Sequence, residues 1–131
     1  MVADLNKEAV ADVVAAGAKE GTYAQIGAEC GVVFTIVPNG DIVKSILFDE
    51  GGVASTLKAG SIVCDMSSVT PVESKECYTR LKEKGVGFID APVSGGEPGA
   101  VAGTLAIMAG GEEKDFQALK EYFDILALLP C

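Results

Sequence analysis

The sequence predicts an α/β domain in which helices flank a mostly parallel β-sheet. Three segments, residues 31–38, 59–68 and 86–93, contain continuous apolar and β-branched runs, which are typical of strands buried on both faces. Helical segments separate these runs, and such alternation favours parallel strands joined by crossover helices. The length of 131 residues suits one domain with a single core.

The helical segments are recognised by the spacing of their apolar residues and by residues typical of helix ends. Asn6 suits an N-cap, Pro71 suits the first turn of a helix, and Gly85 suits the end of that helix. We expect helices over residues 6–17, 23–30, 41–48, 71–84 and 112–127. A short apolar run ends at Asp4, and we expect a fourth buried strand over residues 104–110.

Composition argues against several classes of partner and site. The net charge of −9 and the pI near 4.3 argue against binding to nucleic acid or to an anionic membrane surface. No apolar run reaches the roughly 20 residues that a membrane span needs. Histidine is absent, and the cysteines at positions 30, 64, 77 and 131 form no C-x-x-C pair, so we expect no metal site. Scattered cysteines are typical of a reducing compartment, so we expect buried thiols in a cytoplasmic protein.

Four polar or glycine-rich clusters follow the expected strands. They are Asp4 and the segments 37–40, 65–68 and 91–96. Ligands of open parallel sheets bind beyond the carboxyl ends of the strands. We therefore expect the four clusters to line one crevice.

Each of the first three clusters has two interpretations. Asp4 could accept a hydrogen bond from a ribose hydroxyl, but an Asp before an Asn also caps helices. Segment 37–40 could present its backbone to a cofactor or form a plain turn. Ser67 and Ser68 could donate to a nicotinamide or ribose, or could lead into the helix that starts at Pro71.

The glycine-rich cluster is the most specific of the four. Gly95 and Gly96, which follow Ser94, would let bare amides and one hydroxyl approach a carboxylate closely, as in an anion-binding nest. The alternative is a hairpin-like loop that holds no ligand.

The same segment carries a resemblance to a known family. Residues 90–111, DAPVSGGEPGAVAGTLAIMAGG, resemble the substrate-binding signature of the β-hydroxyacid dehydrogenases, which include 3-hydroxyisobutyrate dehydrogenase and tartronate semialdehyde reductase. The segments VADLNKEAVADVVAAGA, IVPN and GSIVCDMSSVTP are similar to successive parts of that family, in the same order. The resemblance covers residues 2–125 and leans toward the tartronate semialdehyde reductase branch.

The resemblance implies a cofactor site. Asp4 corresponds to the family residue that meets the adenine ribose, and Val37 and Pro38 correspond to a pair that touches the cofactor through its backbone. Ser68 stands where the family has a Ser or Thr near the nicotinamide ribose. Asp4 would repel a 2′-phosphate and no Arg follows it, so we expect NAD to be preferred over NADP.

The resemblance also implies a substrate site and shows what the chain lacks. Ser94, Gly95 and Gly96 match the loop that holds the substrate carboxylate and hydroxyl. The family's G-x-G-x-x-G turn would lie about 20 to 30 residues before Asp4. Its catalytic lysine lies in a C-terminal helical domain, and the ending ILALLPC departs from the family pattern. We therefore expect residues 1–131 to be a partial, Rossmann-like NAD(P)-binding domain that lacks the family's first strand-helix unit and its C-terminal helical domain. We expect it to have no catalytic residue of its own and to be inactive or nearly so by itself.

The implied activity is that of an NAD(P)-dependent oxidoreductase. Such enzymes interconvert a small 3-hydroxy acid and its semialdehyde by hydride transfer, and we expect a homo-oligomer. In the family's strand order a further strand lies between the run ending at Asp4 and the strand ending at Val37, which predicts an open edge on residues 32–37. The alternatives are a non-catalytic remnant that acts as a partner, and a metabolite-binding module that keeps only the Ser94 loop.

Overall fold

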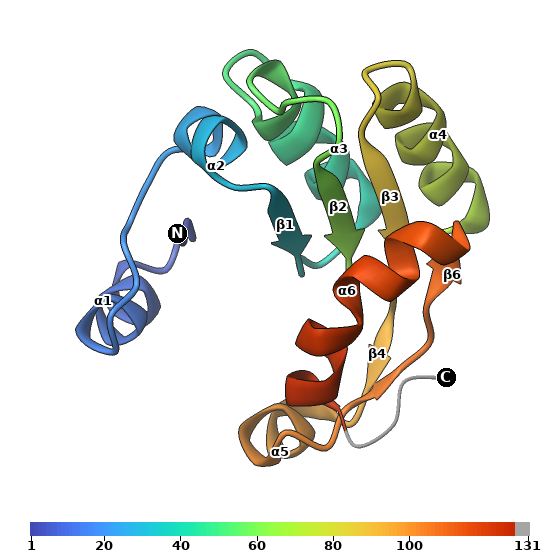
Figure 1. Cartoon of the computed structure of the whole chain (residues 1–131). Helices are drawn as coiled ribbons and strands as arrows, with labels where there is room; N and C mark the ends of the chain where they lie inside the picture. The colour runs from blue at the N-terminus through green and yellow to red at the C-terminus, as the bar shows by residue number, and fades with distance from the viewer. Residues whose placement is uncertain (128–131) are drawn as a thin grey trace.

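The computed structural model describes residues 1–127, which are arranged around a four-stranded sheet (Figure 1). Strands β1 (Val32–Thr35), β2 (Ile62–Asp65) and β3 (Gly87–Asp90) are parallel neighbours, and the two-residue strand β6 (Gly110–Gly111) pairs antiparallel with β3. The arrowheads of β1, β2 and β3 point to the same end of the molecule. The predicted mostly parallel sheet is confirmed.

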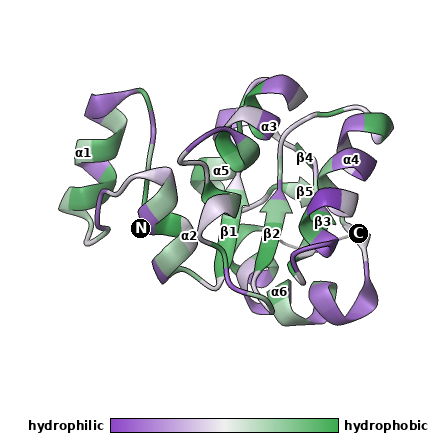
Figure 2. Cartoon of the chain, turned by 90° about the horizontal axis from the view of Figure 1, so that it is seen from above, coloured by the Kyte–Doolittle hydropathy of each residue, from purple (hydrophilic) through white to green (hydrophobic). Residues whose placement is uncertain are grey.

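Helices cover both faces of the sheet. The connections from β1 to β2 and from β2 to β3 contain α3 (Gly40–Phe48) and α4 (Pro71–Lys82), which pack on one face together with α2 (Tyr23–Glu29) and the 3-10 turn η1 (Val53–Ser55). The opposite face is covered by α6 (Glu113–Leu126). Seen from above, the central strands are hydrophobic while α4 carries hydrophilic residues (Figure 2).

The core consists of one apolar cluster on each face. Alternate strand residues supply the two clusters: Val63 and Phe88 pack under α3 and α4, whereas Cys64 and Ile89 pack against α6. This alternation follows from the two-residue period of a strand. The all-buried pattern of β2 explains why its sequence is apolar at each position except the last, Asp65.

Local sequence signals fix the ends of several helices. The Asn6 side chain accepts from the backbone amides of Glu8 and Ala9 and caps α1 (Lys7–Ala15) as predicted. Pro71 is the first residue of α4, and Thr70 and Glu73 form a capping box there.

The N-terminal segment does not join the four-stranded sheet. The run expected to end in a strand at Asp4 makes a single parallel bridge, Val2 to Glu20. Among residues 1–127, strand β1 pairs only with β2, so its other side is an edge of the sheet, as predicted. The carbonyl oxygens of Gly31 and Thr35 accept hydrogen bonds from the amides of Ile62 and Met66, so these odd-numbered residues direct their backbone groups toward β2. The backbone groups of successive strand residues point in opposite directions, so those of Val32 and Phe34 point toward the open edge.

The prediction of a single strand over residues 104–110 is wrong. Residues 104–111 contain two separate two-residue strands: β5 (Ala106–Ile107) pairs antiparallel with β4 (Val93–Ser94), and β6 pairs antiparallel with β3. The connection between β4 and β5 contains only the short helix α5 (Gly96–Ala102). The chain returns through this helix in the direction opposite to β4, which gives the antiparallel pair.

Candidate functional site at the carboxyl ends of the strands

The loops that leave β1, β2 and β3 meet at one edge of the sheet and are hydrogen-bonded to one another. The amide of Met66 donates to the carbonyl of Thr35 at 2.7 Å, and the amide of Ala91 donates to the carbonyl of Asp65 at 2.7 Å. The amide of Val37 donates to the hydroxyl oxygen of Ser67 at 2.9 Å. These bonds extend the parallel pairing past the last strand residues and fix three of the four predicted clusters side by side.

The residues singled out in the loops after β1 and β2 differ in whether a ligand can reach them. Ser67 is 2% exposed, and its hydroxyl accepts from Val37, so this serine holds the loops together. Ser68, next in the chain, is exposed, and so is Pro38. Of the two serines considered in the sequence, Ser68 is therefore the one whose hydroxyl a ligand can reach.

The predicted substrate loop lies between a short strand and a short helix. Ser94 ends β4, Gly95 precedes α5 with φ +135°, and Gly96 starts α5 with φ +60°. All three residues are exposed. Positive φ angles of this kind favour glycine, which gives the two glycines a conformational reason in addition to the predicted close approach of a ligand. The segment also has the hairpin form of the alternative interpretation, since β4 and β5 pair antiparallel around α5.

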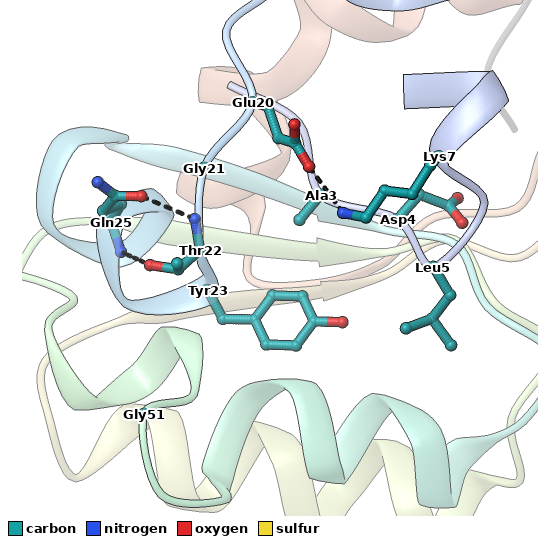
Figure 3. Close-up of a pocket in the computed structure, with 10 residues that line it drawn as sticks. All are labelled: Ala3, Asp4, Leu5, Lys7, Glu20, Gly21, Thr22, Tyr23, Gln25 and Gly51. Atoms are coloured by element: carbon teal, nitrogen blue, oxygen red, sulfur yellow. Dashed lines mark hydrogen bonds and ion pairs between the residues drawn. The ribbon is translucent and has the colours of Figure 1, made fainter. Parts of the chain in front are cut away.

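Asp4 lines a different hollow, which Figure 3 shows in close-up. The cavity has a volume of about 580 Å³, and Leu5 and Tyr23 also line it. One carboxylate oxygen of Asp4 accepts from the amide of Asn6 at 2.8 Å, just before the N-cap of α1. An ion pair of 2.7 Å between Lys7 and Glu20 closes one side. None of the residues lining this cavity belongs to the three loops at the sheet edge, so Asp4 is the predicted site residue that the structure does not bring together with them.

Sequence reasoning placed Asp65 in the 65–68 cluster but gave it no role of its own, and the structure places this residue, buried, at the centre of the three loops. Asp65 is 1% exposed, and its Oδ1 accepts from the Thr35 hydroxyl at 2.8 Å and from the Ser67 amide at 3.1 Å. The available signal was that two neighbouring strands, β2 and β3, both end in Asp.

The cysteines behave as packing residues where they are described. Burial raises the pKa of the Cys64 thiol to about 12 and that of Cys77 to about 11, so both stay protonated at neutral pH. Cys30 is half-buried, and Cys131 lies outside the described residues. Within residues 1–127, no three His, Cys, Asp or Glu side chains are grouped so that they could hold a metal ion. The helices of that part of the chain are too short or too polar to cross a membrane.

Comparisons with known proteins agree with this architecture. Residues 1–129 match the family described as the NAD binding domain of 6-phosphogluconate dehydrogenase. The 2-(hydroxymethyl)glutarate dehydrogenase of Eubacterium barkeri is 41% identical over 124 residues, which make up 94% of this chain and 41% of that enzyme. The 2-hydroxy-3-oxopropionate reductase of Escherichia coli is 40% identical over 105 residues, which make up 80% of this chain and 36% of that enzyme.

The fold is similar to that of a solved dehydrogenase. The crystal structure of 3-hydroxyisobutyrate dehydrogenase from Salmonella typhimurium superposes with a TM-score of 0.90 at 33% identity, over 98% of this chain and 45% of that chain. This chain spans about two fifths of the length of the curated relatives described above. The match over almost all of the chain, together with these relatives, confirms the predicted Rossmann-like fold and the resemblance to hydroxyacid dehydrogenases. The chain belongs to the family of NAD-binding domains found in 6-phosphogluconate dehydrogenase and its β-hydroxyacid dehydrogenase relatives.

Proposed function

We propose that this chain forms the cofactor-facing and carboxylate-binding part of an NAD-dependent dehydrogenase. The reaction is the interconversion of a small 3-hydroxy acid and its semialdehyde by hydride transfer, as the tartronate semialdehyde reductase resemblance implies. The single observation that carries the proposal is the meeting of three loops at the carboxyl ends of β1, β2 and β3, with the Ser94 loop following the third strand. Ligands of parallel sheets bind at such an edge.

The cofactor contacts would come from both the sheet edge and the N-terminal segment. The residues fit a dinucleotide: Asp4 offers a carboxylate beside an open cavity, and an exposed proline turn and the hydroxyl of Ser68 follow neighbouring strands. When bound, NAD supplies the hydride acceptor. The carboxylate of Asp4 would accept hydrogen bonds from the ribose hydroxyls of NAD and would repel the 2′-phosphate of NADP, so we propose that NAD binds more tightly. Val37 and Pro38 would present their backbone to the cofactor.

The substrate contacts would come from the loop after β3. The exposed hydroxyl of Ser94 and the amides of Gly95 and Gly96 can donate to a carboxylate, and the absence of side chains at both glycines leaves their amides open. No residue of this chain is assigned the acid–base role. We therefore propose that residues 1–131 alone turn over little or no substrate, and that the active form is a cytoplasmic homo-oligomer.

A chimera tests the proposal directly. Residues 4–125 of this chain would replace the corresponding segment of the E. coli 2-hydroxy-3-oxopropionate reductase, with which 105 residues of the chain align. The reductase supplies the rest of a working enzyme. We expect reductase activity with a higher kcat/KM for NADH than for NADPH. A clear preference for NADPH would overturn the cofactor assignment, and a folded but inactive chimera would overturn the proposed function.

The substrate loop is tested in the same chimera. Ser94→Ala removes a hydrogen bond to a charged group, which is worth about 1.5 to 3 kcal/mol, or roughly a 10- to 150-fold loss of kcat/KM. Ser55→Ala, on the exposed side of η1, is the matched control and should leave kcat/KM unchanged. Equal kinetics for the two variants would mean that the Ser94 loop is only structural.

A further inference from the structure

A row of three polar side chains crosses the sheet at its carboxyl edge. Thr35, Asp65 and Asp90 are the last residues of β1, β2 and β3, and the strand register places them directly beside one another. Paired residues of parallel strands project from the same face of a sheet. That face is the one covered by α3 and α4, since Val63 and Phe88, two residues earlier on their strands, pack there.

Both carboxyl groups in this row have a buried oxygen without a hydrogen-bond partner. Asp65 uses Oδ1 for the Thr35 hydroxyl and the Ser67 amide, while its Oδ2 has no partner among residues 1–127. The Oδ1 of Asp90 is likewise buried and without a partner in the described chain. Buried polar atoms are nearly always hydrogen-bonded, so two such oxygens on neighbouring positions need a common explanation.

The surroundings do not neutralise two negative charges. Helix α4 contributes Lys75 and Tyr78, which line a cavity of about 390 Å³ with Asp90, and the thiol of Cys77, whose pKa is raised by burial and by the charge of Asp65. Strand β2 adds the thiol of Cys64, and β1 and β6 contain no ionisable residue. In the described part of the chain, no ion pair joins a Lys or Arg to either aspartate.

We propose that Asp90 is protonated at neutral pH and donates through Oδ1 to Oδ2 of Asp65, so that the two side chains bind one proton between them. One proton supplies both missing hydrogen-bond partners and removes one of two adjacent buried charges. Burial raises the pKa of Asp90; the Ser74 hydroxyl opposes this rise, and the charge of Asp65 adds to it.

A proton between Asp65 and Asp90 would complete a hydrogen-bonded network that links the ends of β1, β2 and β3. Asp65 accepts from Thr35 and Ser67 through its side chain, and its backbone carbonyl accepts from the amide of Ala91, the first residue of the loop toward Ser94. Loss of the proton places a second charge in the row and weakens this junction. Because the folded-state pKa of Asp90 is raised, the contribution of the pair to stability is present at low pH and is lost as the pH rises through that value.

The experiment is a pH titration of the aspartate carboxyl carbons by ¹³C NMR on the full chain. At about pH 7, where unperturbed aspartates are ionised, we expect one carboxyl carbon at the shift of a protonated acid. Asp90→Asn should abolish that signal, and so should Asp65→Asn. Asp124→Asn, an exposed residue paired with Lys120, is the control and should leave it in place. A wild-type chain in which every aspartate is ionised at that pH would overturn the proposal.

Thermal unfolding provides an independent measurement that needs only one variant. Asn at position 90 carries a permanent N–H donor and no charge, so Asp90→Asn should mimic the protonated pair at every pH. The pKa of Asp90 is raised above its ordinary value of 3.8, so the folded chain keeps the proton over a pH range in which the unfolded chain has lost it. We expect the wild-type midpoint to fall relative to that of Asp90→Asn as the pH rises from about 4 toward the raised pKa, and to level off above it. A constant difference between the two midpoints would contradict the shared proton. A wild-type midpoint that rises with millimolar MgCl₂, with no such rise in Asp90→Asn, would mean that a cation holds the two carboxylates instead.

Discussion

Replacing Gly27 by alanine should destabilise the domain, although alanine is the better helix former. Gly27 is buried in α2, where this helix packs on η1. A Cβ atom built there would overlap the carbonyl oxygen of Val53 and the hydroxyl of Thr56, and would lie 3.2 Å from the Val53 carbonyl carbon. The Thr56 hydroxyl already donates to the carbonyl of Ala24 at 2.6 Å, so it cannot move without loss of that bond.

The magnitudes of the two opposing effects decide the sign. Alanine gains about 1 kcal/mol over glycine in a helix interior. Overpacking against fixed backbone costs about 1 to 3 kcal/mol, and loss of the Thr56 hydrogen bond costs about 1 kcal/mol more. The net change in the free energy of unfolding is therefore a loss of about 1 to 3 kcal/mol, or a fall of roughly 3 to 12 °C in Tm for a domain of this size.

Urea unfolding followed by circular dichroism measures this difference. The matched control is Gly31→Ala, because a Cβ at Gly31 has no heavy atom within 4 Å and its backbone does not have a positive φ. The control should stay within about 0.5 kcal/mol of the wild type. If Gly27→Ala proved as stable as the wild type or more so, the close packing of α2 on η1 would not exist in solution.

Three further predictions concern charge, the open edge and the thiols. Hydrogen bonds from Lys82 and Tyr78 lower the pKa of Glu112 to about 2. The ionised Glu112 therefore stabilises the fold above its ordinary pKa of 4.5, and this stabilisation is lost as the pH falls toward 2. The difference in free energy of unfolding between the wild type and Glu112→Gln should vanish over that range. Apolar edge strands promote association, so the wild-type chain should self-associate in light scattering. Ile36 is 64% exposed and directly follows β1, so Ile36→Lys should reduce this association, and an unchanged mass would rule out the β1 edge. In a Cys131→Ser background, iodoacetamide should modify half-buried Cys30 well before Cys64, and equal rates would contradict the burial of Cys64.

The elements that the sequence predicted well are those whose signals are local. The helix expected over residues 71–84 is observed over Pro71–Lys82 because Pro71 and the first-turn acid Glu73 act within one turn of the helix end. The strand within residues 31–38 was recognised because its apolar, β-branched composition is itself typical of a buried strand, whichever strand it pairs with.

The elements that the sequence predicted poorly depend on distant partners. Whether residues 104–110 form one strand or two is decided by pairing with Val93–Ser94 and with β3, which apolar content does not encode. Asp65 was included in the 65–68 cluster but given no role of its own for the same reason, since its hydroxyl donor is Thr35, 30 residues away in the chain. Asp4 was predicted together with the sheet-edge loops, but the single bridge from Val2 to Glu20 places its segment beside another cavity.

The weak attachment of α1 has a consequence for hydrogen exchange. Of the residues in this helix only Val10 is buried, while Val13 and Val14 are 45% and 40% exposed. The segment that contains α1 is held by the two backbone bonds around Val2 and by two exposed ion pairs, Lys7–Glu20 and Lys19–Glu29. Exposed ion pairs add little stability, and few apolar contacts oppose opening. The α1 amides should therefore exchange with deuterium through local opening, orders of magnitude faster than those of β2, whose exchange requires global unfolding.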